Sequence, residues 1–135
     1  MEHAPERYAA WLARPAARLW LAEAAETGAP IGYVVLDEAT SPLPDPRGDD
    51  LEIHRLYVLS RWQGRGLGAA LMETALAAAA AAGAGRMRIG VRALNAPAIA
   101  FYKRMGFTVA GTRKHHIGRL EQDDLVLTRL LAPQG

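Results

Sequence analysis

The sequence predicts an α/β fold with a mixed, mostly antiparallel central sheet and one parallel strand–helix–strand crossover. Short segments rich in β-branched and aromatic residues alternate with helical segments, and several of these strands follow one another through short turns. Such neighbours favour antiparallel pairing. The exception is a long alanine-rich segment between the strands at 51–59 and 86–93, which is long enough to cross over as a helix.

The N-terminal part is expected to hold a short helix and a β-hairpin. The helix covers residues 5–14 and ends at Pro15, because proline cannot continue a helix. Strands at 18–24 and 31–38 follow, joined by the turn "TGAP" at 27–30.

The middle of the chain is expected to supply the crossover. Three prolines make residues 40–50 a loop, and the strand at 51–59 follows it. Alanine and leucine are strong helix formers, so a helix is predicted over 67–82, with Gly83 and Gly85 as its C-terminal cap.

The C-terminal part is expected to add one helix and a strand pair after the fourth strand. The helix spans 95–107, with Asn95 as its N-cap and Gly106 closing it. Residues 108–118 and 120–131 then form the last antiparallel pair.

Composition limits the possible functions. A chain of 135 residues with 50% hydrophobic content predicts one domain, residues 1–135, that buries a single core. The absence of cysteine excludes disulfides, thiolate metal sites and cysteine nucleophiles. A net charge of +2 with scattered basic residues argues against nucleic acid as the partner. No signal peptide or membrane span is visible, so we expect a soluble, cytoplasmic protein without a membrane partner.

The stretch "RWQGRGLGAAL" at 61–71 places three glycines between a strand and a helix. Such a turn presents unpaired backbone N–H groups at the positive end of the helix dipole, where phosphate binds. The dinucleotide fingerprint fails here because no acidic residue follows in the next strand, and the P-loop motif fails because Gly-Lys-Ser/Thr is absent. A turn that merely needs positive φ is the structural alternative.

Two motifs carry a resemblance to a known family. Gln63-Gly64-Arg65-Gly66-Leu67-Gly68 matches the pattern Gln/Arg-x-x-Gly-x-Gly/Ala after a strand ending in "LYV". This stretch resembles the acetyl-CoA loop of the GNAT superfamily of N-acetyltransferases. "NAPAIAFYKRMGF" resembles the same superfamily's second signature, an Asn followed by a Tyr near a helix end. The resemblance covers roughly residues 18–131 and implies a GNAT-like fold that lacks its usual first strand.

The resemblance implies acetyl-CoA as co-substrate and no metal. Backbone groups of residues 56–58 would pair with the pantetheine arm, and the amides of 64–69 would bind the pyrophosphate. Tyr102 would protonate the departing thiolate, and a phenol with a pKa of about 10 is a suitable donor. Asn95 would position the cofactor arm. The alternatives are a plain N-cap for Asn95 and a packed aromatic for Tyr102. The predicted cofactor-binding residues are Leu56, Tyr57, Val58, Gln63, Gly64, Arg65, Gly66, Leu67, Gly68, Ala69, Asn95 and Tyr102.

The acceptor must lose a proton, because an alkyl ammonium has a pKa of about 10.4. Glu52 and His54 fall on one face of their strand by the i, i+2 rule. Glu52 acting through a water is the predicted base, since the resemblance suggests a base on this strand. A surface carboxylate at Glu52, and His54 as the base or as a half-buried strand residue, stay open. His115 and His116 are expected to be an ordinary polar pair.

The reaction implied is direct attack by a primary amine on acetyl-CoA, because no residue suited to a covalent acyl-enzyme is visible. The alternative is a module that binds acyl-CoA without turnover. The chain also looks somewhat like the branch of bacterial polyamine acetyltransferases, and peptide amines remain open as acceptors. The acidic side chains that would suit a cationic acceptor are Glu52, Glu121, Asp123 and Asp124.

The resemblance implies that the strand at 18–24 is a sheet edge, because only about seventeen residues precede it where the superfamily usually has an opening strand. Its first half is apolar after Arg18, it lacks proline and lysine, and Glu23 is the only charge in its interior. Edges of this kind pair readily with a second chain. We therefore expect a homodimer or strand exchange through this edge, unless the first seventeen residues cover it.

Overall fold

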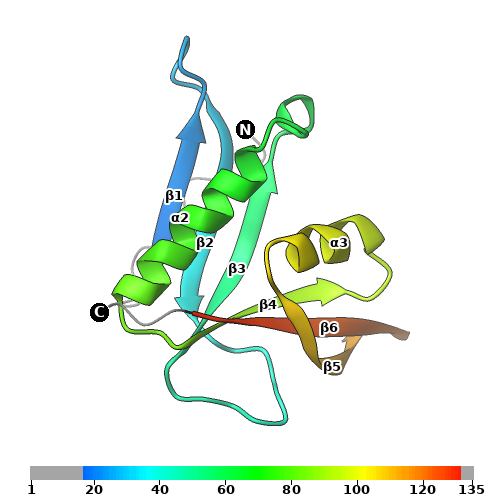
Figure 1. Cartoon of the computed structure of the whole chain (residues 1–135). Helices are drawn as coiled ribbons and strands as arrows, with labels where there is room; N and C mark the ends of the chain where they lie inside the picture. The colour runs from blue at the N-terminus through cyan, green and yellow to red at the C-terminus, as the bar shows by residue number, and fades with distance from the viewer. Residues whose placement is uncertain (1–16, 132–135) are drawn as a thin grey trace.

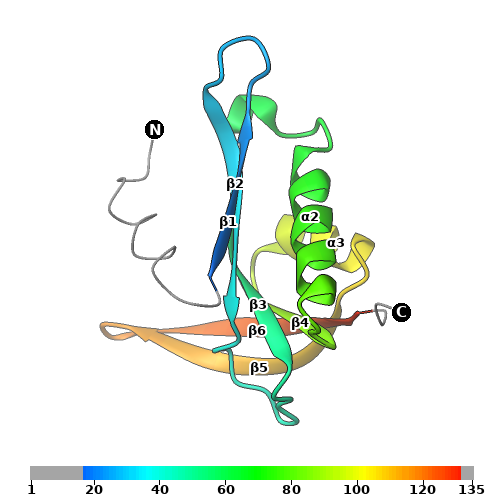
Figure 2. The same cartoon turned by 90° about the vertical axis from the view of Figure 1, so that its left-hand side faces the viewer.

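The computed structural model describes residues 17–131, and for residues 115–117 and 120–122 it describes the backbone alone. Six strands form one sheet in the order β1-β2-β3-β4-β6-β5, and both helices lie on the same face of it (Figures 1 and 2). The expected helix at 5–14 falls outside the described residues. The elements are β1 Arg18–Glu23, β2 Pro30–Glu38, β3 Asp50–Val58, the 3₁₀ helix η1 Ser60–Trp62, α2 Leu67–Ala81, β4 Arg86–Arg92, α3 Ala96–Arg104, β5 Thr108–Ile117 and β6 Leu120–Leu130.

The predicted fold class is confirmed. Every neighbouring pair of strands is antiparallel except β3 and β4, which are parallel and joined through α2. The predicted boundaries agree to within a residue or two, apart from α3, which ends at Arg104 rather than near 107. The chain leaves α3 through Gly106, whose φ of +93° is costly for any other residue.

The hydrophobic core lies between α2 and the sheet. The helix buries Leu71, Met72, Ala75, Leu76 and Ala79. Small alanine side chains let the helix approach the sheet closely, and each fully buried Leu or Met contributes about 1.5–3 kcal/mol relative to exposure. The sheet residues that complete this core cluster are Val34, Leu36, Ile53, Met87, Ile89, Val91 and Leu127.

The parallel pair β3–β4 is short, and its end creates a gap in the sheet. The ladder pairs Asp50 to Ile53 with Arg86 to Ile89, and beyond it the two strands diverge (Figure 1). The end of β3, Leu56 to Val58, therefore has β2 as its strand neighbour on one side and the gap on the other.

A β-bulge interrupts β3 where the gap begins. Arg55 pairs with Val35 and Ile53 pairs with Leu36, so His54 is an extra residue opposite β2. The bulge shifts the alternation of side chains by one residue. As a result, Ile53 packs against the α2 core, and so do Leu56 and Val58 beyond the bulge.

Within residues 17–131, neither helix is long and apolar enough to cross a membrane. At the sheet edge, β1 has β2 as its one described strand neighbour, and its Leu21 is 48% exposed.

Candidate active site

An open groove of about 660 Å³ lies between the end of β3, the start of α2 and one side of α3. It contains all of the predicted cofactor-binding residues except Tyr57, Arg65 and Leu67. The groove therefore gathers both sequence motifs, which lie about thirty residues apart in the chain. Its lining residues are Leu56, Val58, Gln63, Gly64, Gly66, Gly68, Ala69, Asn95, Pro97, Ala98, Phe101, Tyr102, Arg104 and Met105.

The glycine loop leaves empty space at the start of α2. Gly64 and Gly66 both have φ of +79°, and a Cβ built on either would meet nothing within 4 Å. The first helical hydrogen bond runs from the Ala70 N–H to the Gly66 carbonyl, at 3.0 Å. The preceding amides, 67–69, therefore have no acceptor inside the helix, and they stand at its positive end. This combination suits an anionic group.

Two loop residues also stabilise the loop itself. The Gln63 side-chain amide donates a hydrogen bond to the Val58 carbonyl at 3.0 Å, which ties the loop to the end of β3. The Arg65 guanidinium lies over the Trp62 ring, 4.8 Å from its centroid. Arg65 therefore lies beside Trp62 and not in the groove lining.

The backbone of β3 faces the gap at alternate residues. The Leu59 N–H bonds to the Ile31 carbonyl, so the ladder bonds to β2 fall on the odd-numbered residues 55, 57 and 59. The backbone N–H and carbonyl groups of Leu56 and Val58 therefore point toward the gap. Tyr57 instead pairs with Tyr33 of β2, and the two rings lie 5.9 Å apart.

Tyr102 lies on α3, half-buried against the groove. Its ring is edge-on to Phe107, with centroids 6.2 Å apart. Burial raises the pKa of the Tyr102 phenol above its ordinary value of 10.0. The hydroxyl thus holds its proton at neutral pH, as a proton donor must.

Asn95 caps α3. Its side-chain Oδ1 accepts a hydrogen bond from the Ala98 N–H at 3.2 Å. The N-cap alternative is therefore realised, and the residue also lines the groove, so its predicted contact with a cofactor stays a prediction.

The sequence analysis did not identify several residues in and next to α3 that line the groove. The missed residues recur every three or four positions, which places them on one face of a helix. That spacing, counted forward from Asn95 and around Tyr102, could have found them. Arg104 adds a positive charge to the groove. The missed lining residues are Pro97, Ala98, Phe101, Arg104 and Met105.

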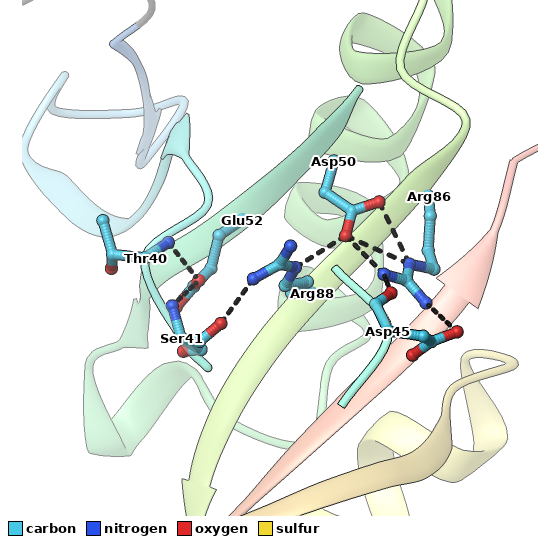
Figure 3. A network of polar contacts seen from close by, with 7 residues as sticks. All are labelled: Thr40, Ser41, Asp45, Asp50, Glu52, Arg86 and Arg88. Atoms are coloured by element: carbon cyan, nitrogen blue, oxygen red, sulfur yellow. Dashed lines mark hydrogen bonds and ion pairs between the residues drawn. The ribbon is translucent and has the colours of Figure 1, made fainter. Parts of the chain in front are cut away.

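Glu52 does not line the groove. It is 5% exposed and lies on the helix-free face of the sheet, under the loop between β2 and β3. Its Oε1 accepts hydrogen bonds from the backbone N–H groups of Thr40 at 3.0 Å and Ser41 at 2.9 Å. Its Oε2 accepts one from the Ser41 hydroxyl at 2.6 Å (Figure 3). An ionised carboxylate has about four acceptor positions, so about one is left for water.

A buried ion cluster lies beside Glu52. The Asp50 carboxylate accepts hydrogen bonds from Arg86 at 2.6 Å and from Arg88 at 2.7 Å (Figure 3). Arg88 also donates to the Ser41 carbonyl, and Arg86 donates to the Asp45 carbonyl at 3.0 Å. Burial alone would raise the pKa of Asp50, but the hydrogen bonds and charges of both arginines outweigh it and lower that pKa.

The prediction that His54 shares a face with Glu52 assumed a β-strand without a bulge. His54 is the bulge residue, so the i, i+2 rule no longer fixes its face relative to Glu52. Its Nε2 lies 2.7 Å from the Glu38 carbonyl, which can only accept, so Nε2 carries the proton. His115 and His116 lie on β5, and their side chains fall outside the described structure, as does that of Glu121.

The two neighbouring aspartates on β6 differ. Asp123 is exposed and pairs with Lys114 at 3.3 Å. Asp124 is 7% exposed, and its Oδ2 accepts a hydrogen bond from Arg113 at 3.2 Å. Among the described residues, the buried Asp124 Oδ1 has no hydrogen-bond partner.

Known proteins match this chain over most of its length. A model of the acetyltransferase (GNAT) family matches residues 1–107. The uncharacterized N-acetyltransferase Rv2669 of Mycobacterium tuberculosis is 37% identical over 127 residues, which cover 93% of this chain and 74% of that protein.

Solved structures agree. Nourseothricin acetyltransferase has a TM-score of 0.73 and 30% identity, and the match covers 87% of this chain and 67% of that one. A GNAT family acetyltransferase from Elizabethkingia anophelis, with acetyl-CoA bound, has a TM-score of 0.71 and 20% identity over 95% of this chain and 84% of that one. With the glycine loop and its groove, these matches show that the chain belongs to the acetyltransferase (GNAT) family and is an acetyl-CoA-dependent N-acetyltransferase acting on an amine.

Proposed function

We propose that the groove beside α3 holds acetyl-CoA and that a primary amine attacks it directly, with Tyr102 as the general acid. The observation that carries this proposal is the single groove in which the glycine loop and the Tyr102 side chain meet. The pyrophosphate would lie over Gly64 and Gly66, where the space is open, and Arg104 adds a positive charge to the lining of the same groove.

Once the ammonium has lost a proton and become the neutral amine, the reaction needs two further proton movements. The neutral amine nitrogen attacks the thioester carbonyl carbon, and the C–S bond breaks as the carbonyl re-forms. The Tyr102 hydroxyl gives its proton to the leaving thiolate, and its raised pKa keeps that proton available until the thiolate departs. The amine loses one proton, which restores the charge balance.

Glu52, acting through a water, stays the proposed acceptor of the amine proton. What supports it is the acceptor position that the three loop donors leave open. His54, partly buried on β3, is the alternative base.

We also propose that the acceptor amine is cationic, either a polyamine or a larger molecule. Asp124 supports it, because a buried carboxylate oxygen with no described partner costs free energy that an ammonium ligand would recover. The relative with 30% identity is named for acting on nourseothricin, which adds that compound to the acceptors to be tested. We also keep the cytoplasm as the proposed location.

The test is release of CoA from acetyl-CoA in the presence of one amine at a time. The panel contains spermidine, nourseothricin, an aminoglycoside, a lysine-containing peptide and a peptide with a free N-terminus. We expect turnover with at least one cationic amine, and mass spectrometry should find the acetyl group on its nitrogen. Tight acetyl-CoA binding without turnover on any amine would contradict the proposal and favour a binding module.

We further propose that the β1 edge pairs with a second copy of the chain. The exposed Leu21 and the single described neighbour of β1 support this. Leu21→Lys is the variant to use, because Trp20 packs against the core and its loss would also destabilise the fold. Light scattering should find a dimer for the wild type and a monomer for Leu21→Lys. A wild-type monomer at micromolar concentration would contradict pairing.

A further inference from the structure

The loop between β2 and β3 crosses the helix-free face of the sheet. We call residues 40–44 of this loop the strap. The Ser41 hydroxyl lies 3.4 Å from the position of a Cβ on Gly90 of β4. Leu43 and Pro44 each lie 3.3 Å from the position of a Cβ on Gly111 of β5. The strap therefore passes over two strands at points where neither has a side chain.

The two glycines belong to one row of the sheet. Gly90 and Gly111 both pair with Val126 of β6, which lies between them. A Cβ at Gly111 would crowd the Leu43 and Pro44 side chains by a few tenths of an ångström, and one at Gly90 would just touch the Ser41 hydroxyl, so the strap packs closely on this row.

Two buried side chains of the sheet hold the strap. Glu52 accepts three hydrogen bonds from Thr40 and Ser41, and Arg88 donates one to the Ser41 carbonyl (Figure 3). Arg88 is itself fixed by Asp50. The strap is thus attached at its N-terminal end to β3 and β4.

The attachment point lies at the start of the gap. Ile89 is the last β4 residue that pairs with β3, so Gly90, beneath Ser41, is the first residue beyond that ladder. The groove proposed for acetyl-CoA opens on the helix side of the same gap. An amine that attacks the thioester has to enter from the side that the cofactor leaves free, which is the strap side.

We propose that the strap forms one wall of the acceptor entrance and that Glu52 is the positioning residue that sets this wall. This inference rests on the proposed function of the groove. It gives the Glu52 carboxylate a role that does not require proton transfer.

Two substitutions at Glu52 separate positioning from base catalysis. In Glu52→Gln the amide oxygen still accepts from the two backbone N–H groups, and the amide N–H₂ donates to the Ser41 hydroxyl, which turns to accept. This variant keeps the strap but has no basic oxygen. Glu52→Ala removes both functions.

For positioning, we expect Glu52→Gln to keep the wild-type KM for the acceptor, whereas its kcat and pH profile report on the separate proposal that Glu52 is the base. Glu52→Ala should raise the KM for the acceptor by roughly tenfold or more, with the KM for acetyl-CoA unchanged. Glu38→Ala, an exposed carboxylate at the end of β2, is the matched control and should behave as wild type. A Glu52→Gln enzyme whose KM for the acceptor rises as much as that of Glu52→Ala would overturn the positioning role, whatever its kcat.

A second variant guards against misfolding of Glu52→Ala. Gly111→Ala pushes on Leu43 and Pro44 without touching Glu52, and it should also raise the KM for the acceptor alone. An unchanged KM in Gly111→Ala would overturn the strap as a wall.

Hydrogen exchange separates this inference from the proposed function. In Glu52→Ala the amides of Thr40 and Ser41 should exchange faster, whatever the activity. Unchanged exchange there would overturn the positioning role. Failure of the wild-type protein to bind acetyl-CoA would instead overturn the proposed function of the groove.

Discussion

The two faces of the sheet are buried by different means. On the helix side, apolar residues such as Met72 and Ile53 pack against one another, and the space beside them is left open as the groove. On the other side, the charged residues Asp50, Glu52 and Arg88 are buried beneath a loop. Apolar packing tolerates exchange between side chains of similar volume, whereas a buried ion needs its own partner. The helix face thus supplies general stability, and the strap face depends on specific pairs.

The largest effect is expected from a substitution that fills the open space in the groove on the helix side of the sheet. Gly66→Val should abolish acetyl-CoA binding, because the new side chain occupies the place predicted for the pyrophosphate. Titration calorimetry measures the affinity, and thermal unfolding shows whether the protein is folded.

Gly83→Val is the matched control for this substitution. Gly83 lies at the other end of α2, has φ of +89° and also faces open space. In both variants, valine in the left-handed conformation costs about 1–2 kcal/mol. Of the two glycines, only Gly66 lines the groove. If the folded Gly66→Val protein binds acetyl-CoA as well as Gly83→Val does, the loop is not the pyrophosphate site.

The next effect concerns the charges beneath the strap. Asp50→Ala leaves two buried arginines without their carboxylate and should lower the free energy of unfolding by about 3–5 kcal/mol. Asp123→Ala breaks an exposed ion pair and should cost less than about 1 kcal/mol. Urea denaturation measures both. Equal losses would mean that burial does not distinguish these pairs.

The smallest of the three effects concerns chemistry in the groove. Tyr102→Phe should lower kcat by about 10²-fold, the low end for loss of a general acid, while acetyl-CoA affinity stays the same. The ring contacts with Phe107 are kept, so the fold should not change. Steady-state kinetics with an active amine checks this, and a normal kcat would leave Tyr102 with a packing role alone.

The sequence predicted the strands, the crossover helix and the glycine loop because local signals determine them. Gly64 and Gly66 were expected to leave space for a phosphate, with a turn that merely needs positive φ as the alternative, and both residues have open space and positive φ. Asn95 as N-cap followed in the same way from its place before a helix. These features depend on residues close together in the chain.

The strap face could not be predicted from the sequence. Asp50 and Arg86 are 36 residues apart, and their pairing depends on the register of a parallel ladder that no local pattern states. The partners of Glu52 are mainly backbone N–H groups of a loop, which every residue type except proline offers. The i, i+2 rule for Glu52 and His54 failed for the same reason, because the bulge can be recognised only once β3 is aligned with β2.

Because of the bulge at His54, the number of residues in β3 determines which of its side chains face α2 and which face the strap. Before it, Ile53 contacts α2, and after it Leu56 and Val58 do so, which odd–even alternation alone would not allow. Deleting His54 would leave Leu56 and Val58 facing the core by plain alternation, whereas deleting a residue beyond the bulge, such as Leu56, would turn Tyr57 toward the core. Insertions and deletions in relatives of this chain should therefore avoid the part of β3 beyond the bulge and collect in the loop between Pro46 and Asp49, which lies beyond the strap and is exposed to solvent.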